Sequence, residues 1–341
     1  MSSDKIKVLV VDDSYLMRIL ISDILSSFSD IEVVGTAKDG KEAIELVKKL
    51  KPDVVTLDYE MPGLSGIEVL EHIMNENPLP CIMLSAYTRE GAEITLSALE
   101  KGAFDFVAKP SGSISMDIEK IKMELYEKIK LAKKVDPHIL RFKFKKVEIK
   151  EKEKVRRVNA IGIVSSTGGP PVVEFILKNI PKVKVPIFIV QHMPKSFVTL
   201  FAERLRKVTG KKVFEGRDKE KVKEGYIYIA PGGIHMGLKK VKEEVFINLI
   251  DDEPKWGVKP SGDYILSSIS EIYGENSLGI ILTGMGKDGS EGARKIKEKG
   301  GIVISQSKET SVIYGMPCAV KEISDFILSP EEIVEKIMEF L

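Results

Sequence analysis

Short apolar runs alternate with amphipathic segments along the first 135 residues. The runs are rich in Val, Ile and Leu and end in turn residues, which is typical of strands, whereas the intervening segments repeat apolar residues at helical spacing. The pattern predicts strands at residues 5–13, 31–37, 53–63, 80–86 and 103–110. It predicts helices at residues 15–28, 40–50, 66–76, 90–102 and 116–134. Strictly alternating strands and helices indicate βαβ units and a parallel sheet that is covered on both faces.

The same alternation restarts after residue 157. Apolar runs predict further strands at residues 158–166, 185–192, 226–233, 278–284 and 301–306. Residues 235–251 read as a small antiparallel hairpin, and helical patterns lie between the strands and at the end of the chain. We therefore expect an α/β protein of two domains, the second a doubly wound, mostly parallel sheet with a hairpin. The expected boundaries are residues 1–135 for the first domain, 136–156 for a charged linker and 157–341 for the second domain.

Composition narrows the function classes. The chain has 341 residues with 43% hydrophobic and 30% charged residues, the balance of a globular protein. Lys and Arg number 52 and Asp and Glu number 51, so the net charge of +1 gives no bias toward nucleic acid or an anionic membrane. No secretory or membrane-spanning pattern is seen, and Cys81 and Cys318 do not suggest a disulfide framework. We expect a cytoplasmic protein without membrane insertion or nucleic-acid partner.

Polar residues gather at the predicted strand ends of the first domain. Asp12 and Asp13 follow the first strand, Asp58 ends the third, Ser85 the fourth and Lys109 the fifth. Strand ends of a parallel sheet share one edge, so these groups should converge. Clustered carboxylates repel one another unless a cation lies among them, and a hard oxygen site with open positions suits Mg²⁺.

The segments VVDDS, LDYEMPGLSG, LSA and FVAKP, in this order, resemble the receiver domain of two-component response regulators over about residues 4 to 125. The resemblance implies a five-stranded, flavodoxin-like parallel sheet. It implies that Asp58 accepts a phosphoryl group from a histidine kinase and that Asp12, Asp13 and Asp58 bind Mg²⁺. It further implies that Ser85 and Lys109 form the switch pair and that Phe106 is the aromatic residue that reorients with Ser85.

Candidates for a nucleophile, a base and an orienting carboxylate follow predicted strands of the second domain. The segment SSTGGPP follows its first strand, His192 its second, and Asp288 lies in the loop after the strand at 278–284. A serine nucleophile needs a histidine base, which in turn needs a carboxylate to orient it. A hydrolytic triad is therefore possible on one edge of the sheet, although the serine does not lie in the G-x-S-x-G pattern.

Several alternatives remain at this loop. Strand geometry alone does not separate Ser165 from Ser166, although the hydroxyl nearest the start of the next helix is favoured, because free amides there can stabilise an oxyanion. A phosphate-cradling loop is the rival interpretation, but the G-x-x-x-x-G-K-[ST] pattern is absent and no lysine directly follows the glycines.

Two residues outside this loop also allow two interpretations each. His235 is either a second hydrogen-bonding partner or a turn residue, and Trp256 either lines a substrate groove or packs against neighbouring side chains.

The segments SSTGGP, QHMP, APGGIH, LTGMGKDGSEG, GIVISQ and YGMP, behind a receiver, resemble the chemotaxis protein-glutamate methylesterase response regulators. The resemblance implies Ser166, directly before Thr-Gly-Gly, as nucleophile, with His192 as base and Asp288 as its partner. It implies the Met285 amide as oxyanion donor with support from Thr167. One departure is clear: the family usually has Gly-Ala or Gly-Ser before the nucleophile, and this chain has Val164 and Ser165.

These observations predict a phosphorylation-activated serine hydrolase. The resemblance implies that it demethylates γ-glutamyl methyl esters on the cytoplasmic helices of chemoreceptors and that it deamidates receptor glutamines. Mg²⁺ should serve phosphorylation of the receiver, whereas the esterase chemistry needs no cofactor. The alternative is a phosphorylation-dependent binding module whose second domain is catalytically silent.

Overall fold

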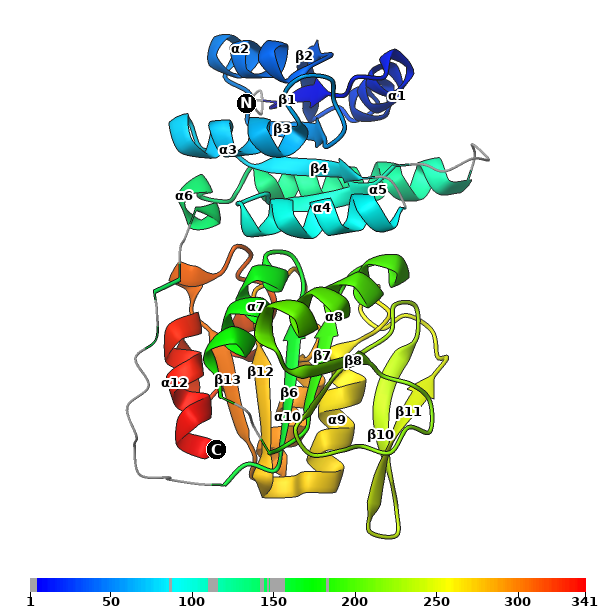
Figure 1. Cartoon of the computed structure of the whole chain (residues 1–341), viewed down its shortest axis with the longest axis vertical. Helices are drawn as coiled ribbons and strands as arrows, with labels where there is room; N and C mark the ends of the chain where they lie inside the picture. The colour runs from blue at the N-terminus through cyan, green and yellow to red at the C-terminus, as the bar shows by residue number, and fades with distance from the viewer. Residues whose placement is uncertain are drawn as a thin grey trace. The chain divides into compact units, whose positions relative to one another are not determined.

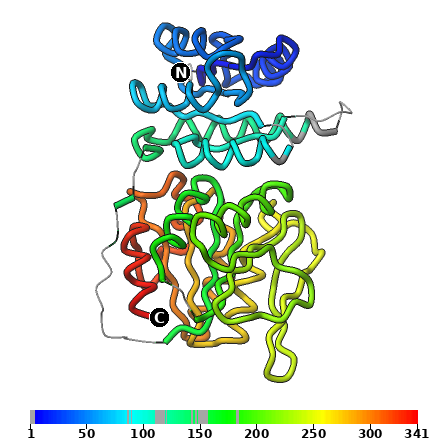
Figure 2. Tube along the Cα trace, in the orientation of Figure 1, coloured from blue at the N-terminus to red at the C-terminus, as the bar shows by residue number. Residues whose placement is uncertain are grey.

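The computed structural model describes residues 5–85, 88–109, 116–141, 144, 145, 147, 157–181 and 184–341. The chain divides into two compact units, Met1–Phe142 and Lys143–Leu341, here called the N-terminal unit and the C-terminal unit. Each is an α/β structure in Figure 1, and the trace in Figure 2 follows the chain through both. Among the described residues, no helix combines the length and the apolar character needed to cross a membrane.

The N-terminal unit contains a parallel sheet in the order β2-β1-β3-β4-β5, so the predicted five-stranded flavodoxin-like sheet is confirmed. Its strands are β1 (Ile6–Val11), β2 (Ile31–Ala37), β3 (Val54–Asp58), β4 (Cys81–Ser85) and β5 (Asp105–Ala108). Its helices are α1 (Tyr15–Ser26), α2 (Gly40–Leu50), α3 (Gly66–Glu76), α4 (Arg89–Glu100), α5 (Met116–Ala132) and the short α6 (Pro137–Leu140). The central strands β3 and β4 are buried along their whole length, as expected when helices cover both faces.

The segment predicted as a linker, residues 136–156, begins with α6, which Asp136 caps through the amide of His138. Most of the remaining linker lies outside the described residues. Of the part that is described, Phe144 stacks on Phe175, and the Lys145 amide donates to Glu331.

The C-terminal unit contains a parallel sheet in the order β14-β13-β12-β6-β7-β9-β8 and a separate antiparallel pair, β10-β11. The sheet strands are β6 (Ala160–Ser165), β7 (Ile187–Gln191), β8 (Lys212–Glu215), β9 (Tyr226–Ile229), β12 (Ser277–Ile281), β13 (Ile302–Gln306) and β14 (Phe326–Leu328). The pair consists of β10 (His235–Val241) and β11 (Glu244–Ile250). The predicted sheet and hairpin are therefore confirmed, with two edge strands, β8 and β14, that the hydrophobic pattern did not indicate.

Helices cover both faces of this sheet (Figure 1). They are α7 (Gly169–Asn179), α8 (Lys195–Thr209), α9 (Gly262–Tyr273), α10 (Ser290–Glu298), α11 (Met316–Val320) and α12 (Pro330–Phe340). Chain order reverses at the centre of the sheet, since β6 lies between β7, which follows it, and β12, which comes much later. Parallel α/β sheets bind ligands outside the carboxyl ends of the strands at such a point.

Candidate functional sites

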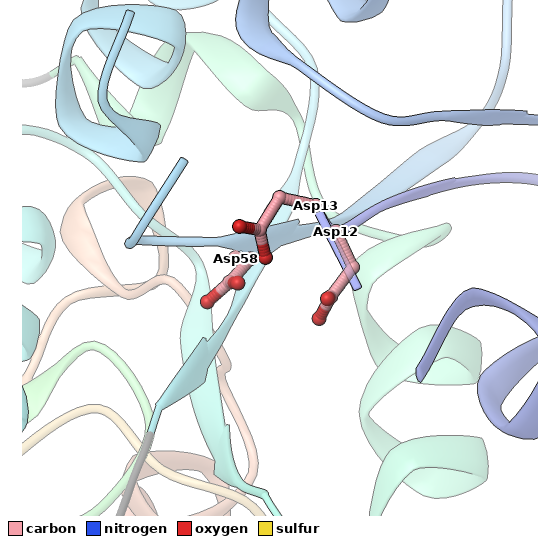
Figure 3. Close-up of side chains that lie close together, drawn as sticks. All are labelled: Asp12, Asp13 and Asp58. Atoms are coloured by element: carbon pink, nitrogen blue, oxygen red, sulfur yellow. The ribbon is translucent and has the colours of Figure 1, made fainter. Parts of the chain in front are cut away.

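The carboxyl edge of the N-terminal sheet carries a compact acidic cluster. Carboxylate oxygens of Asp12, Asp13 and Asp58 all lie within 4.8 Å of one another (Figure 3). Asp12 and Asp58 are buried, whereas Asp13 is exposed. Three converging carboxylates with an open side match the oxygen donors and the retained waters that Mg²⁺ prefers. The predicted residues are thus brought together, in an arrangement typical of a Mg²⁺ site.

Lys109 compensates the charge of this cluster. Its ammonium lies 2.8 Å from Asp12 Oδ2 and 2.7 Å from Asp58 Oδ2. Burial raises the pKa of Asp58 to about 6, even though the hydrogen bond and the charge of Lys109 act in the opposite direction. Burial opposes the charge of Lys109, but the hydrogen bonds to the two carboxylates and their negative charges together outweigh it and raise the pKa of Lys109. Lys109 offsets part of the cost of burying the charge of Asp58, which can still gain or lose a proton in a mildly acidic solution.

Local structure explains why Asp58 lies at this edge. Gly66 begins α3 and donates its amide to the Tyr59 carbonyl at 3.0 Å. A Cβ atom at residue 66 would lie 2.0 Å from the carbonyl oxygen of Asp58, so only glycine permits this approach. Arg18 fixes the other side of the cluster, because its guanidinium donates to the carbonyl oxygens of Asp12 and Asp13.

Of the predicted switch residues, Lys109 contacts the acidic cluster, and Ser85 and Phe106 make contacts with helices. The Ser85 hydroxyl accepts from Thr95 Oγ1 at 2.8 Å and donates to the Gly91 carbonyl at 3.2 Å, so these bonds run to α4. Phe106 is buried in β5, and the ammonium of Lys128 lies over its ring, 5.1 Å from the centroid.

In the C-terminal unit, adjacent strands place the predicted nucleophile loop beside the predicted base. Ser165 on β6 pairs with Gln191 on β7, so Ser166 and His192 directly follow paired residues. The His192 amide donates to the Ser165 carbonyl at 3.1 Å, and the Ser166 amide donates to the Thr283 carbonyl, beyond β12, at 3.0 Å. No hydrogen bond joins the Ser166 hydroxyl to His192 in the described part of the chain. In free enzymes such bonds are often long and shorten when substrate binds.

The two serines occupy different environments. Ser165 is fully buried, and its hydroxyl donates to Gln191 Oε1 at 2.6 Å. Ser166 is partly exposed at the turn that leads into α7. Only the second hydroxyl can therefore meet a substrate without breaking an internal hydrogen bond. The first turn of α7 has fewer amide donors than we expected, because Pro170 and Pro171 carry no N–H.

His192 and Asp288 are in direct contact. His192 Nε2 lies 2.8 Å from Asp288 Oδ2. Asp288 is buried, and although burial alone would favour the neutral form, hydrogen bonds from His192 and Ser261 hold its pKa below the usual value. The carboxylate is therefore ionised at neutral pH and holds a proton on Nε2. The other ring nitrogen, Nδ1, remains as the acceptor for a serine proton.

The remaining candidates are placed as follows. Met285 exposes 44% of its surface, and no backbone partner for its amide is found in the described residues. The Thr167 carbonyl accepts from Thr283 Oγ1 at 3.0 Å, which fixes the turn after Ser166. His235 is fully buried, and half-exposed Trp256 donates to Asp263 at 2.8 Å.

Sequence reasoning missed two residues of this site. Gln191 is buried and donates to the carbonyl oxygens of Ser166 and His192, at 3.0 and 3.2 Å, so it joins the two loops. Ser261 donates to Asp288 at 2.5 Å. Gln191 could have been suspected, since it is one of two glutamines in the chain and ends a buried strand.

Val164, the departure noted in the sequence, is accommodated opposite a glycine. It is fully buried, and a Cβ atom at Gly262 would lie 2.4 Å from its Cγ1. β6 nevertheless continues through Ser165, so the larger side chain does not end the strand early.

Comparison with known proteins agrees with this arrangement. Residues 8–118 match the response regulator receiver domain family, and residues 161–337 match the CheB methylesterase family. A protein-glutamate methylesterase/protein-glutamine glutaminase of Thermotoga maritima is 46% identical over 344 residues and 100% of both chains. One of Methanococcus maripaludis is 45% identical over 357 residues and 98% of both chains. The crystal structure of the Thermotoga maritima CheB methylesterase catalytic domain covers 54% of this chain and 99% of its own, with 42% identity and a TM-score of 0.53. The chain therefore belongs to the CheB-type protein-glutamate methylesterases/protein-glutamine glutaminases that carry an N-terminal receiver domain.

Proposed function

We propose that this chain removes methyl groups from γ-glutamyl methyl esters of chemoreceptors, with Ser166 as nucleophile, His192 as base and Asp288 as the residue that orients the base. The observation that carries the assignment is the hydrogen bond between His192 Nε2 and ionised Asp288, beside a partly exposed serine that directly follows the neighbouring strand. Family membership supplies the reaction class, and the geometry supports the roles.

The reaction follows from these positions. Ser166 Oγ attacks the ester carbonyl carbon while its proton passes to His192 Nδ1, because Asp288 already occupies Nε2. Collapse of the tetrahedral intermediate transfers that proton to the departing methoxide, which leaves as methanol. Water then attacks the acyl-enzyme carbonyl carbon and gives one proton to Nδ1, which passes it to the Ser166 oxygen as the acyl bond breaks. The released glutamic acid loses its remaining proton to solvent and becomes a carboxylate. With a glutamine side chain, ammonia leaves in the first step instead.

The negative charge of the intermediate needs donors at the strand edge. The Met285 amide follows Gly284, and Gly284 approaches Ser166 so closely that a Cβ there would lie 2.7 Å from Ser166 Cβ. This proximity supports Met285 as an oxyanion donor. Thr167 contributes indirectly, because its carbonyl oxygen accepts a hydrogen bond from Thr283 and so fixes the turn beside Ser166. Removing one such donor typically lowers kcat about 100-fold to 1,000-fold.

The N-terminal unit regulates this reaction. We assign Asp58 as the acceptor of a phosphoryl group from the chemotaxis histidine kinase, with Asp12, Asp13 and Asp58 as the residues that would hold Mg²⁺. Bound Mg²⁺ would neutralise charge on the transferred phosphoryl oxygens. Lys109 would contact the same oxygens. Ser85 must give up its bonds to α4 to reach them, and this exchange, with Phe106, would distinguish the phosphorylated state.

Phosphorylation raises esterase activity in this proposal, and the unphosphorylated receiver restrains it. A fragment from Val155 to Leu341 should then demethylate receptors faster than the unphosphorylated full chain. Equal rates would leave the receiver no restraining role.

The central test uses neighbouring serines as a matched pair. Methanol release from methylated receptor should fall at least 1,000-fold in Ser166→Ala, whereas Ser165→Ala should keep more than a tenth of wild-type kcat. Because the triad acts as a unit, Ser166→Ala/His192→Ala should be little worse than either single variant. Full activity in Ser166→Ala would refute the assignment of the nucleophile.

A further inference from the structure

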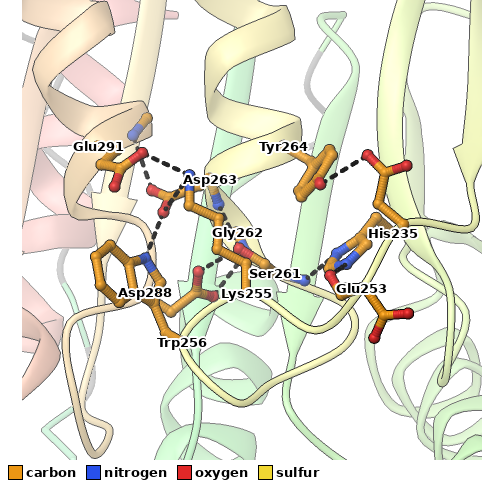
Figure 4. A network of polar contacts seen from close by, with 12 residues as sticks. His235, Glu253, Lys255, Trp256, Ser261, Gly262, Asp263, Tyr264, Asp288 and Glu291 are labelled. Carbon is orange, nitrogen blue, oxygen red and sulfur yellow. Dashed lines mark hydrogen bonds and ion pairs between the residues drawn. The ribbon is translucent and has the colours of Figure 1, made fainter.

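A chain of buried polar contacts joins Asp288 to the start of α9 and to His235 (Figure 4). The Ser261 hydroxyl donates to Asp288 Oδ1 at 2.5 Å, and the Gly262 amide donates to Oδ2 at 2.6 Å. With His192 Nε2 at 2.8 Å from Oδ2, the carboxylate has a donor on each oxygen and a second on Oδ2. Its position is therefore set by Ser261 and Gly262 as much as by His192.

Ser261 and Gly262 form the start of α9. Ser261 is the N-cap, and its hydroxyl also accepts from the Asp263 amide at 3.2 Å. The unpaired amides at the start of a helix favour a negative charge nearby. Asp288 therefore uses the N-terminus of α9 as its binding site, so any movement of this helix end moves the carboxylate.

His235 holds this helix end in place. It is fully buried at the start of β10, and its Nδ1 accepts from the Ser261 amide at 3.0 Å. Its Nε2 lies 3.0 Å from the Glu253 carbonyl oxygen, to which it donates, and its ring stacks on Tyr264 at 4.1 Å. Since Nδ1 accepts from an amide, His235 is neutral with its proton on Nε2.

We propose that His235 and Ser261 are positioning residues, which fix Asp288 and through it the ring of His192. The inference rests on the proposed catalytic roles of Ser166, His192 and Asp288. Neither residue would touch the substrate: both are fully buried, and His235 reaches Asp288 only through Ser261. Losing the Nδ1 acceptor frees the start of α9, and a displacement of about 1 Å in a catalytic group can cost about 100-fold in rate.

Substitution of His235 by Asn or by Gln tests the roles of its two ring nitrogens separately. In His235→Asn the side-chain oxygen occupies the place of Nδ1 and can accept from Ser261. In His235→Gln the side-chain nitrogen occupies the place of Nε2 and can donate to Glu253, but the acceptor for Ser261 is lost. Measured on the full chain with methylated receptor, kcat should fall at least tenfold in His235→Gln with KM changed less than twofold, roughly the cost of a misplaced group. His235→Asn should restore kcat to within about threefold of wild type. Equal kcat for the Asn and Gln variants would overturn the proposal.

A second readout does not depend on turnover. The chain has four histidines, so nitrogen-labelled histidine gives a simple spectrum in which the His192 ring N–H can be followed. Hydrogen exchange of this proton should be faster in His235→Gln and in Ser261→Ala, and should return toward the wild-type rate in Ser261→Thr, which keeps a hydroxyl. If His235→Gln does not fold, the Ser261 pair tests the same chain of contacts. Unchanged exchange and kcat in Ser261→Ala would refute positioning by this route.

The outcomes separate this inference from the proposed function. Asp288→Asn is the reference, because it removes the partner of His192 directly. If Asp288→Asn and Ser166→Ala keep wild-type activity, the catalytic assignment fails. If both are inactive while His235→Gln and Ser261→Ala behave as wild type, only the positioning role fails.

Discussion

The contact between Gly262 and Val164 connects the stability of the C-terminal unit to the position of Asp288. A methyl group at residue 262 would lie 2.4 Å from Val164 Cγ1 and 2.5 Å from Cγ2. Carbon atoms in ordinary contact are about 3.5–4.0 Å apart, so Gly262→Ala must move α9 and β6 apart by about 1 Å. The same residue donates its amide to Asp288 at 2.6 Å, so the shift also weakens the support of the carboxylate.

The expected cost follows from these distances. Overpacking costs about 1–3 kcal/mol, and the lower chain entropy of alanine returns about 0.4–1 kcal/mol. A net loss of about 1–2 kcal/mol lowers the melting temperature of a unit of this size by roughly 2–8 °C. We expect kcat to fall roughly 10-fold to 100-fold, since the displacement is about 1 Å.

Trp256, the single tryptophan of the chain, reports the unfolding of the C-terminal unit in guanidinium chloride. Gly237→Ala is the matched control: a methyl there would lie 3.5 Å from its nearest neighbour, Ile250 Cδ1, so it should not destabilise the unit. Val164→Ala removes the two closest contacts and leaves a Cβ–Cβ distance of 3.0 Å. The double variant Val164→Ala/Gly262→Ala should therefore lose at least about 1 kcal/mol less stability than the sum of the losses of the two single variants. Additivity within about 0.5 kcal/mol would refute the steric explanation.

Three further predictions concern buried polar groups. Burial raises the pKa of Asp58 to about 6, so without metal its contribution to stability is fully present below about pH 4 and is lost as the pH rises through 6. Mg²⁺ binds the ionised carboxylate, so calorimetry should show tighter binding from pH 5 to pH 7 in wild type but not in Asp58→Asn. Lys109→Met should lower the melting temperature of the N-terminal unit more at pH 7 than at pH 5, because it leaves Asp12 and Asp58 facing each other, and Mg²⁺ should reverse much of the loss. Ser165→Ala should destabilise the C-terminal unit by about 1–3 kcal/mol in chemical denaturation, since Gln191 Oε1 loses its donor; a loss below about 0.5 kcal/mol would mean that this bond contributes little.

The hydrophobic pattern predicted the strands that are buried on both faces, because an apolar run bounded by turn residues is typical of a strand in the core of a parallel sheet. It missed β8 and β14, which are strands of four and three residues at the edges of the sheet. Short edge strands bury little surface, and their few residues show no distinct alternation of apolar and polar side chains. Their pairing depends on neighbours that the local sequence does not reveal.

The candidate site shows a similar division. Asp12, Asp58, His192 and Asp288 could be placed from the sequence, since polar residues at the ends of parallel strands share an edge. Strand geometry did not separate Ser166 from Ser165, and the choice between them rested on the start of the next helix and on the family resemblance. The contacts of the supporting residues could not be predicted. Ser261 contacts Asp288 and His235 contacts Ser261, and both contacts depend on how β10 and α9 pack together, which no local pattern encodes.

The placement of β6 between β7 and β12 also determines when this protein can become active during its synthesis. A ribosome that has passed β7 and His192 has already made Ser166, but not Thr283, which follows β12, or the loop with Asp288. The serine turn therefore lacks its contact with Thr283, and His192 lacks Asp288, until most of the chain is made. The N-terminal unit is built from contiguous earlier residues and can fold first. A nascent or prematurely ended chain would consequently carry a foldable receiver but no assembled hydrolase, so esterase activity would not precede its own regulator.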